Sequence, residues 1–179
     1  MAILLHRVRR RTADLAARFA RAEDGATALE FALVAMPFLL LVFAIIELGL
    51  VLLISLTLEN AVIEVGRTIR TGEVQKNGGT AASFKTAICN KMAWGGVGCQ
   101  TALSVDVRTF SDYASSTPTN NTVPTTMTWN PGSDGSIVLV RAYYTWPLVA
   151  PLLNTGLQTA SGKQVIYAAT AFTNEPFNQ

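Results

Sequence analysis

Residues 31–54 read FALVAMPFLLLVFAIIELGLVLLI and contain one charged side chain, Glu47. At about 1.5 Å of rise per residue, a helix of this length crosses a hydrocarbon core of about 30 Å. A buried core helix of a soluble protein is normally shorter and is not apolar on all sides over such a length. A secretory signal has a shorter apolar region and is followed by an Ala-x-Ala cleavage site, which is missing here. The stretch therefore predicts a transmembrane helix.

The basic residues on the two sides of this helix predict its orientation. Six arginines precede residue 25, whereas the nearest basic residues after the helix are Arg67 and Arg70. Because cytoplasmic flanks carry the excess of Arg and Lys, the N-terminus is predicted to lie in the cytoplasm. The last part of the chain, about 125 residues, is then predicted on the other side, which for a bacterial inner membrane is the periplasm.

Length and composition leave room for this anchor and one modest folded domain. The chain has 179 residues, of which 50% are hydrophobic and 15% charged,. The only histidine, His6, lies among the leader arginines, so no histidine-based catalytic or zinc site can form elsewhere,. The glycines of residues 94–99, WGGVGC, lack the strand and helix that flank a phosphate-binding loop. We therefore expect that the chain is not an enzyme. We also expect that it binds no cofactor, metal ion, small-molecule substrate or nucleic acid.

The seven residues GATALEF at 25–31 link the basic leader to the apolar helix. A glycine, small or apolar residues, a glutamate at Glu30 and an aromatic at Phe31 form the arrangement that prepilin peptidases recognise. Cleavage would then fall between Gly25 and Ala26. The residues alone also allow a simpler interpretation, in which Gly25 is a hinge and Glu30 is an acid favoured by the dipole near a helix start.

The longer sequence resembles the TadE-like family of tight adherence (Tad) pilus assembly proteins. The resemblance rests on the box at residues 25–31, on Ile46-Glu47-Leu48-Gly49 within the apolar helix, and on the pairs Asn60-Ala61 and Gly66-Arg67. It covers the first 72 residues well and the remainder mainly by layout. One departure is Thr173, before the closing Asn174-Glu175-Pro176, where the family often has arginine.

This resemblance implies a minor pseudopilin of a Tad-type, type IVb-like pilus, which is a structural protein for pilus biogenesis and surface adherence. The implied partners are prepilin peptidase, other pilins or pseudopilins, and the inner-membrane assembly platform. Glu30 is implied to neutralise the amino terminus of a neighbouring subunit; the alternative is that it pairs with its own amino group or remains hydrated among lipid headgroups. The alternative is a single-span membrane protein whose periplasmic domain binds or scaffolds an envelope complex without entering a pilus.

Beyond the span, the pattern becomes amphipathic. Apolar side chains recur at helical spacing while polar ones fall elsewhere, which predicts that the helix continues to residue 71 with Gly72 as its C-cap. The predicted stripe consists of Leu58, Val62, Val65 and Ile69. A second helix is predicted at residues 80–93, with an apolar side made by Ala81, Phe84, Ala87, Ile88 and Met92,.

Three segments alternate with a period of two and are predicted as strands: residues 103–110, 137–146 and 165–173,. Residues 111–135 are predicted as a long exposed loop, and residues 147–153 as a short apolar loop. The expected fold is α+β and pilin-like, with a long N-terminal helix, a second helix and an antiparallel sheet of about three strands. The expected parts are a leader (1–25), a membrane and stalk helix (26–72), and a periplasmic domain (73–179).

Three further side chains carry specific expectations. Cys89 and Cys99 are the only cysteines and both fall on the predicted periplasmic side, so we expect a disulfide between them; the alternative is two unpaired buried thiols,. Glu47 lies toward the periplasmic end of the span, where an ionised carboxylate is costly. It is expected to be protonated, hydrated at the interface, or in contact with an assembly partner.

Overall fold

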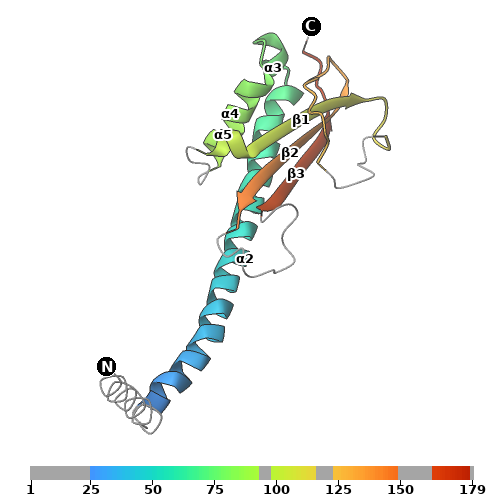
Figure 1. Cartoon of the computed structure of the whole chain (residues 1–179). Coiled ribbons are helices and arrows are strands. Elements are labelled where there is room, and N and C mark those ends of the chain that lie inside the picture. Colours follow the sequence, from blue (N-terminus) through green and yellow to red (C-terminus); the bar gives the residue numbers. More distant parts are fainter. Residues whose placement is uncertain (1–24, 93–97, 116–122, 149–162, 178–179) are drawn as a thin grey trace, which may run out of the picture. The chain divides into compact units, whose positions relative to one another are not determined.

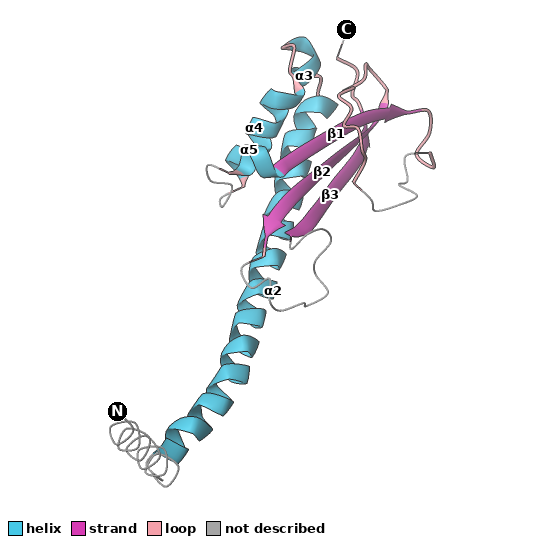
Figure 2. Cartoon of the chain, viewed as in Figure 1, coloured by secondary structure: helices cyan, strands magenta, loops and turns pink. Residues whose placement is uncertain are grey.

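The computed structural model describes residues 25–92, 98–115, 123–148 and 163–177. The chain divides into two compact units, Met1–Phe43 and Ala44–Gln179, and helix α2 contributes to both. The second unit contains the remaining described elements (Figures 1 and 2). In chain order these are α2 (Ala26–Arg70), α3 (Glu73–Lys76), α4 (Ala81–Lys91), α5 (Cys99–Ala102), β1 (Leu103–Phe110), β2 (Ile137–Pro147) and β3 (Lys163–Thr173).

Helix α2 starts directly after Gly25 and passes through Pro37 without ending. A proline inside a helix removes one backbone hydrogen bond, which a membrane-spanning helix tolerates when neighbouring groups adjust. The helix ends at Arg70, and two residues later Gly72 adopts a φ of 77°, a left-handed conformation that favours glycine,. The predicted continuation of the apolar helix is confirmed, although the helix ends at Arg70, one residue before the predicted end, and Gly72 is the N-cap of the next helix, α3.

Helix α4 has a complete capping box, because Thr80 and Ser83 exchange side-chain and backbone hydrogen bonds,. It corresponds to the predicted second helix, and its buried residues include Phe84 and Ile88. The short helices α3 and α5 were not predicted. A disulfide joins Cys89 of α4 to Cys99 at the start of α5, which confirms the predicted bridge.

The three strands form one antiparallel sheet in the order β1-β2-β3. β1 has the predicted bounds, and β2 is one residue longer than predicted. β3 begins at Lys163, two residues before the predicted start, and ends at Thr173 as predicted. The expected α+β fold, with a long N-terminal helix, another helix and a three-stranded antiparallel sheet, is therefore confirmed.

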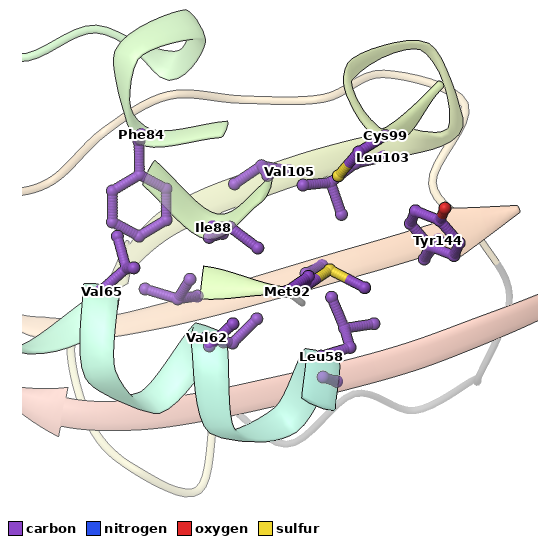
Figure 3. Packing of buried hydrophobic residues seen from close by; sticks show 14 of the residues in the cluster. Leu58, Val62, Val65, Phe84, Ile88, Met92, Cys99, Leu103, Val105 and Tyr144 are labelled. Carbon is purple, nitrogen blue, oxygen red and sulfur yellow. The ribbon is translucent and has the colours of Figure 1, made fainter. Parts of the chain in front are cut away.

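The hydrophobic core of the second unit lies between α2, α4 and one face of the sheet (Figure 3). All four residues of the predicted α2 stripe are buried in this core. They pack with Phe84, Ile88 and Met92 from the α4 region and with alternating residues of β1 and β2. Full burial of such a side chain contributes about 1.5–3 kcal/mol, so this half of α2 is an integral part of the folded domain.

The structure corrects part of the predicted exposed loop at 111–135. Trp129 is half-buried, its ring lies 5.3 Å from that of Phe84, and its Nε1 donates a hydrogen bond to the Gly79 carbonyl. Backbone hydrogen bonds from Val107 to Thr128 and from Asn130 to Val107 fix this segment along β1. Of the predicted apolar loop, residues 149–153 lie outside the described residues.

Candidate functional site

The junction before the apolar helix is open. Gly25 is exposed and has no heavy atom within 4 Å of the position that a Cβ would occupy. Glu30 and Phe31 lie in the first turns of α2 and are also exposed, Phe31 by 75%. Gly25, Glu30 and Phe31 of the predicted processing box are therefore accessible from outside the subunit in the described structure.

The part of α2 that belongs to the first unit is apolar on all sides. Nearly all its large apolar side chains are exposed, and α2 is the one described helix long and apolar enough to cross a membrane. Such a surface requires lipid or other protein to cover it. This finding fits a single-pass membrane anchor.

Glu47 occupies a different environment from Glu30. It belongs to the second unit, is 2% exposed, and lies on the same side of α2 as Ile54 and Leu58, which pack into the core. Glu47 also takes part in an interaction within the chain. The described structure therefore shields most of the Glu47 side chain from solvent, and the expected alternatives of a protonated or hydrated carboxylate stay predictions. A contact between subunits at Glu47 stays a prediction.

The pairs Asn60-Ala61 and Gly66-Arg67 each place a small residue in the core of the domain and a polar residue on its surface. Ala61 and Gly66 are buried, whereas Asn60 and Arg67 are exposed. At Gly66 the helix approaches β3 so closely that an added Cβ would lie 3.3 Å from the Thr170 methyl group and 3.4 Å from the Phe172 ring. The small residues thus set the distance between helix and sheet.

The closing residues of the chain fix the C-terminal end of α2. Arg70 Nε donates to Glu175 Oε1 at 2.9 Å, and the Glu175 amide donates to the Arg70 carbonyl at 2.8 Å. The Phe177 ring covers Gly72 so closely that any side chain there would clash. Asn174 is buried, and its Nδ2 donates to the carbonyls of two residues in the 131–133 turn. The closing motif therefore acts as a clamp on the end of the helix.

Asp106 is a buried charge that the sequence did not reveal. Its side chain is 0% exposed, yet it accepts hydrogen bonds from Arg108, Arg141 and the Thr128 amide. The strand alternation identified Asp106 as one polar position among several, and the pairing with Arg141 requires the β1–β2 register. With its hydrogen-bonding capacity used in this way, the carboxylate is suited to holding structure rather than to chemistry.

A groove of about 490 Å³ lies among α2, α3 and α4. Its lining combines apolar residues such as Phe84 with charged ones, including Glu64 and Lys91, which form an exposed ion pair. Within the described ranges, no group of three or more His, Cys, Asp or Glu residues could hold a metal ion. Among the described residues, the groove therefore shows no cluster suited to a metal ion.

Residues 25–67 match the family model described as TadE-like protein. The match begins at the glycine of the predicted processing box and ends at Arg67, so it includes both short motifs after the span. It confirms the family resemblance over this part of the chain. No curated protein and no solved structure matches the chain.

Proposed function

We propose, from the TadE-like match over residues 25–67, that this chain is a minor pseudopilin of a Tad-type pilus. In this role it is a membrane-anchored structural subunit for pilus biogenesis and adherence, without catalytic activity. The observation that carries the proposal is the continuity of the match from the glycine-glutamate box through the entire apolar helix. TadE-like pilus proteins are structural proteins, which agrees with this role.

Within this proposal, the chain has three parts: a cytoplasmic leader (1–25), a membrane and stalk helix (26–72), and a periplasmic domain (73–179). Prepilin peptidase removes the leader after Gly25, and the mature chain begins at Ala26. The subunit sits in the bacterial inner membrane with its N-terminus in the cytoplasm until it joins the pilus. Its partners are other pilins or pseudopilins and the Tad assembly platform.

Glu30 supplies the assembly contact in this proposal. After cleavage, the new α-amino group at Ala26 and the Glu30 carboxylate both lie at the start of an apolar helix. Burying two charges is costly unless they are paired. We propose that Glu30 of an entering subunit pairs with the amino terminus of its neighbour. The exposure of Glu30 in the subunit supports this role, because its carboxylate is available to another chain.

Two variants, Glu30→Gln and Glu30→Ala, test this contact in cells with an active pilus system. Both should insert in the membrane and lose the leader normally, but should fail to support piliation and to co-purify with other pilins. Glu73→Gln is the matched control, since Glu73 is an exposed acid in the first turn of another helix. Normal piliation by both Glu30 variants would remove the assembly role.

The same experiment separates the proposal from its alternative, a single-span protein with a scaffolding domain that never enters a pilus. That alternative predicts a retained leader and no effect of Glu30 variants on piliation. Topology is read separately by a periplasm-active reporter fused after the C-terminal residue. A reporter that is active only in the cytoplasm would contradict the proposed orientation.

A further inference from the structure

The two edges of the sheet differ in what pairs with them. Along β1, the Val107 amide donates to the Thr128 carbonyl and the Asn130 amide donates to the Val107 carbonyl, so another segment of the chain covers this edge. Among the described residues, β3 pairs with β2 alone, and no backbone group bonds to its other edge (Figure 2). We call the part of this edge from Tyr167 to Phe172 the open edge.

The sequence of β3 does not protect the open edge. Native edge strands carry prolines, bulges or charged residues that prevent pairing with another chain. β3 contains no proline and pairs with β2 residue by residue without a bulge, and its one charged residue, Lys163, is its first. The donors and acceptors of the open edge are therefore suited to an added strand.

Helix α2 presents an apolar side chain next to the open edge. An added Cβ at Gly66 would lie 3.4 Å from the Phe172 ring, so this side of α2 faces β3. Glu64 pairs with Lys91, which shows that α4 lies on another side of α2. Ile63 lies one helical turn before Gly66, on the side away from α4, and is 52% exposed,.

A bilayer around the apolar stretch ends before Ile63. The uncharged residues end at position 54, and Ile63 follows nine residues later, which is about 13 Å farther along the helix,. Its exposed surface is therefore in water, where burial is favourable. Because neighbouring strands lie about 4.8 Å apart, a strand added to the open edge would extend the sheet over this side of α2.

Charge indicates which side chains such a strand carries. Glu59 lies one turn before Ile63 on the same side of α2, is exposed, and forms no ion pair within the described part of the chain. The rise between these two residues is about 6 Å, close to the roughly 6.6 Å between alternate residues of a strand. A strand with an apolar residue over Ile63 would therefore bring its next side chain on that face near Glu59, where a basic residue is favoured.

A second copy of this chain does not fit the open edge. A two-fold axis that pairs two equal edges makes the strands antiparallel and stands perpendicular to the sheet. Helix α2 packs along the face of the sheet, so the same axis reverses its direction. The two membrane anchors would then point in opposite directions. The β1 edge of a second copy is covered at Val107 by its own chain.

We propose that the open edge, together with Ile63 and Glu59, binds an extended segment of a different protein. The segment adds a strand to the sheet, with an apolar residue over Ile63 and a basic residue over Glu59. Main-chain hydrogen bonds hold the segment, and the side of α2 selects its alternate side chains. The inference goes beyond the proposed function and does not depend on it, because it rests on the edge of the sheet and its flank alone.

A tethered peptide tests this site in the full-length chain in nonionic detergent. A short peptide of alternating valine and threonine, with one valine replaced by lysine, is fused after the last residue through a flexible Gly/Ser linker, which raises its effective concentration. Hydrogen exchange of residues 163–173 is followed by mass spectrometry. The outward amides of β3 should exchange roughly tenfold more slowly than with a control peptide that has a proline at its centre, because proline cannot donate to the ladder.

Charge reversal tests the assignment of the side chains. Glu59→Lys should reduce the protection by roughly two- to fivefold with the lysine peptide, and glutamate in place of the peptide's lysine should restore it. Glu73→Lys, at an exposed acid of α3, is the matched control and should leave the protection unchanged.

Three results would overturn the proposal. These are equal exchange with the alternating and the proline peptide, outward β3 amides that are already protected without a fused peptide, and protection that Glu59→Lys does not change. All three are measured on purified protein without other pilus proteins. Leader removal in cells with an active peptidase reports separately on the proposed function.

Discussion

Replacing Leu58 by alanine tests whether the second half of α2 is part of the folded core. Leu58 is 0% exposed and packs in the cluster formed by α2, α4 and the sheet (Figure 3). The substitution removes three carbon atoms from a site enclosed on all sides. Helix and sheet are both held by the surrounding structure, so the cavity is expected to remain largely open.

The magnitude follows from two contributions. Loss of burial costs about 0.8 kcal/mol for each carbon atom, or about 2.4 kcal/mol, and the residual cavity adds to this loss. We therefore expect the free energy of unfolding to decrease by about 3 kcal/mol, a change of about 150-fold in the folded-to-unfolded ratio.

The assay is urea-induced unfolding of the full-length protein in nonionic detergent, followed by tryptophan fluorescence. Trp129 is a suitable probe, because it contacts Phe84 in the same domain. Leu53→Ala is the matched control: the same substitution, on the same helix, at a residue that is 38% exposed. It should change stability by less than about 1 kcal/mol. Equal destabilisation by the two variants would refute the conclusion that α2 completes the core.

Three further outcomes are expected from the described structure. Replacing Cys89 and Cys99 together by serine should lower the free energy of unfolding by about 2–3 kcal/mol, and reduction of the wild-type protein should reproduce this loss in the same unfolding assay,. Gly72→Ala should lower the free energy of unfolding by at least about 1–2 kcal/mol, because alanine is strained at a φ of 77° and its Cβ meets the Phe177 ring,. Adding Phe177→Ala should remove the clash with the ring but not the backbone strain. Burial raises the pKa of three tyrosines above the usual value near 10. Their contribution to the free energy of unfolding is therefore complete below pH 10 and is lost as the pH rises through the higher pKa values of the folded protein,. In an ultraviolet titration, the tyrosines of the native protein should ionise at a higher pH than those of the denatured protein. These tyrosines are Tyr143, Tyr144 and Tyr167.

Periodicity predicted the main elements because each has one face in the core. The alternation of β1 follows from its position at the edge of a sheet with one face against the helices, and the stripe beginning at Leu58 follows from helical geometry. The disulfide was predictable because the chain has only two cysteines. These features depend on local spacing or on composition, which a sequence contains directly.

Features that depend on distant contacts were not predictable in the same way. Helices α3 and α5 each have four residues, too few to show a helical period. The burial of Asp106 requires Arg141 from the neighbouring strand, which the spacing within β1 does not show. The contact of Glu175 with the end of α2 and the hydrogen bonds of Asn174 to the 131–133 turn likewise join residues far apart in the chain.

The mature N-terminus tests the central claim most directly. The full-length chain is expressed with an active prepilin peptidase, purified from membranes, and its mass and N-terminal sequence are determined. We expect a chain that begins at Ala26 and lacks all six leader arginines, and we expect Gly25→Leu to retain the leader. A wild-type chain that keeps residues 1–25, or begins anywhere other than Ala26, in cells that process another prepilin would contradict the assignment as a processed pseudopilin.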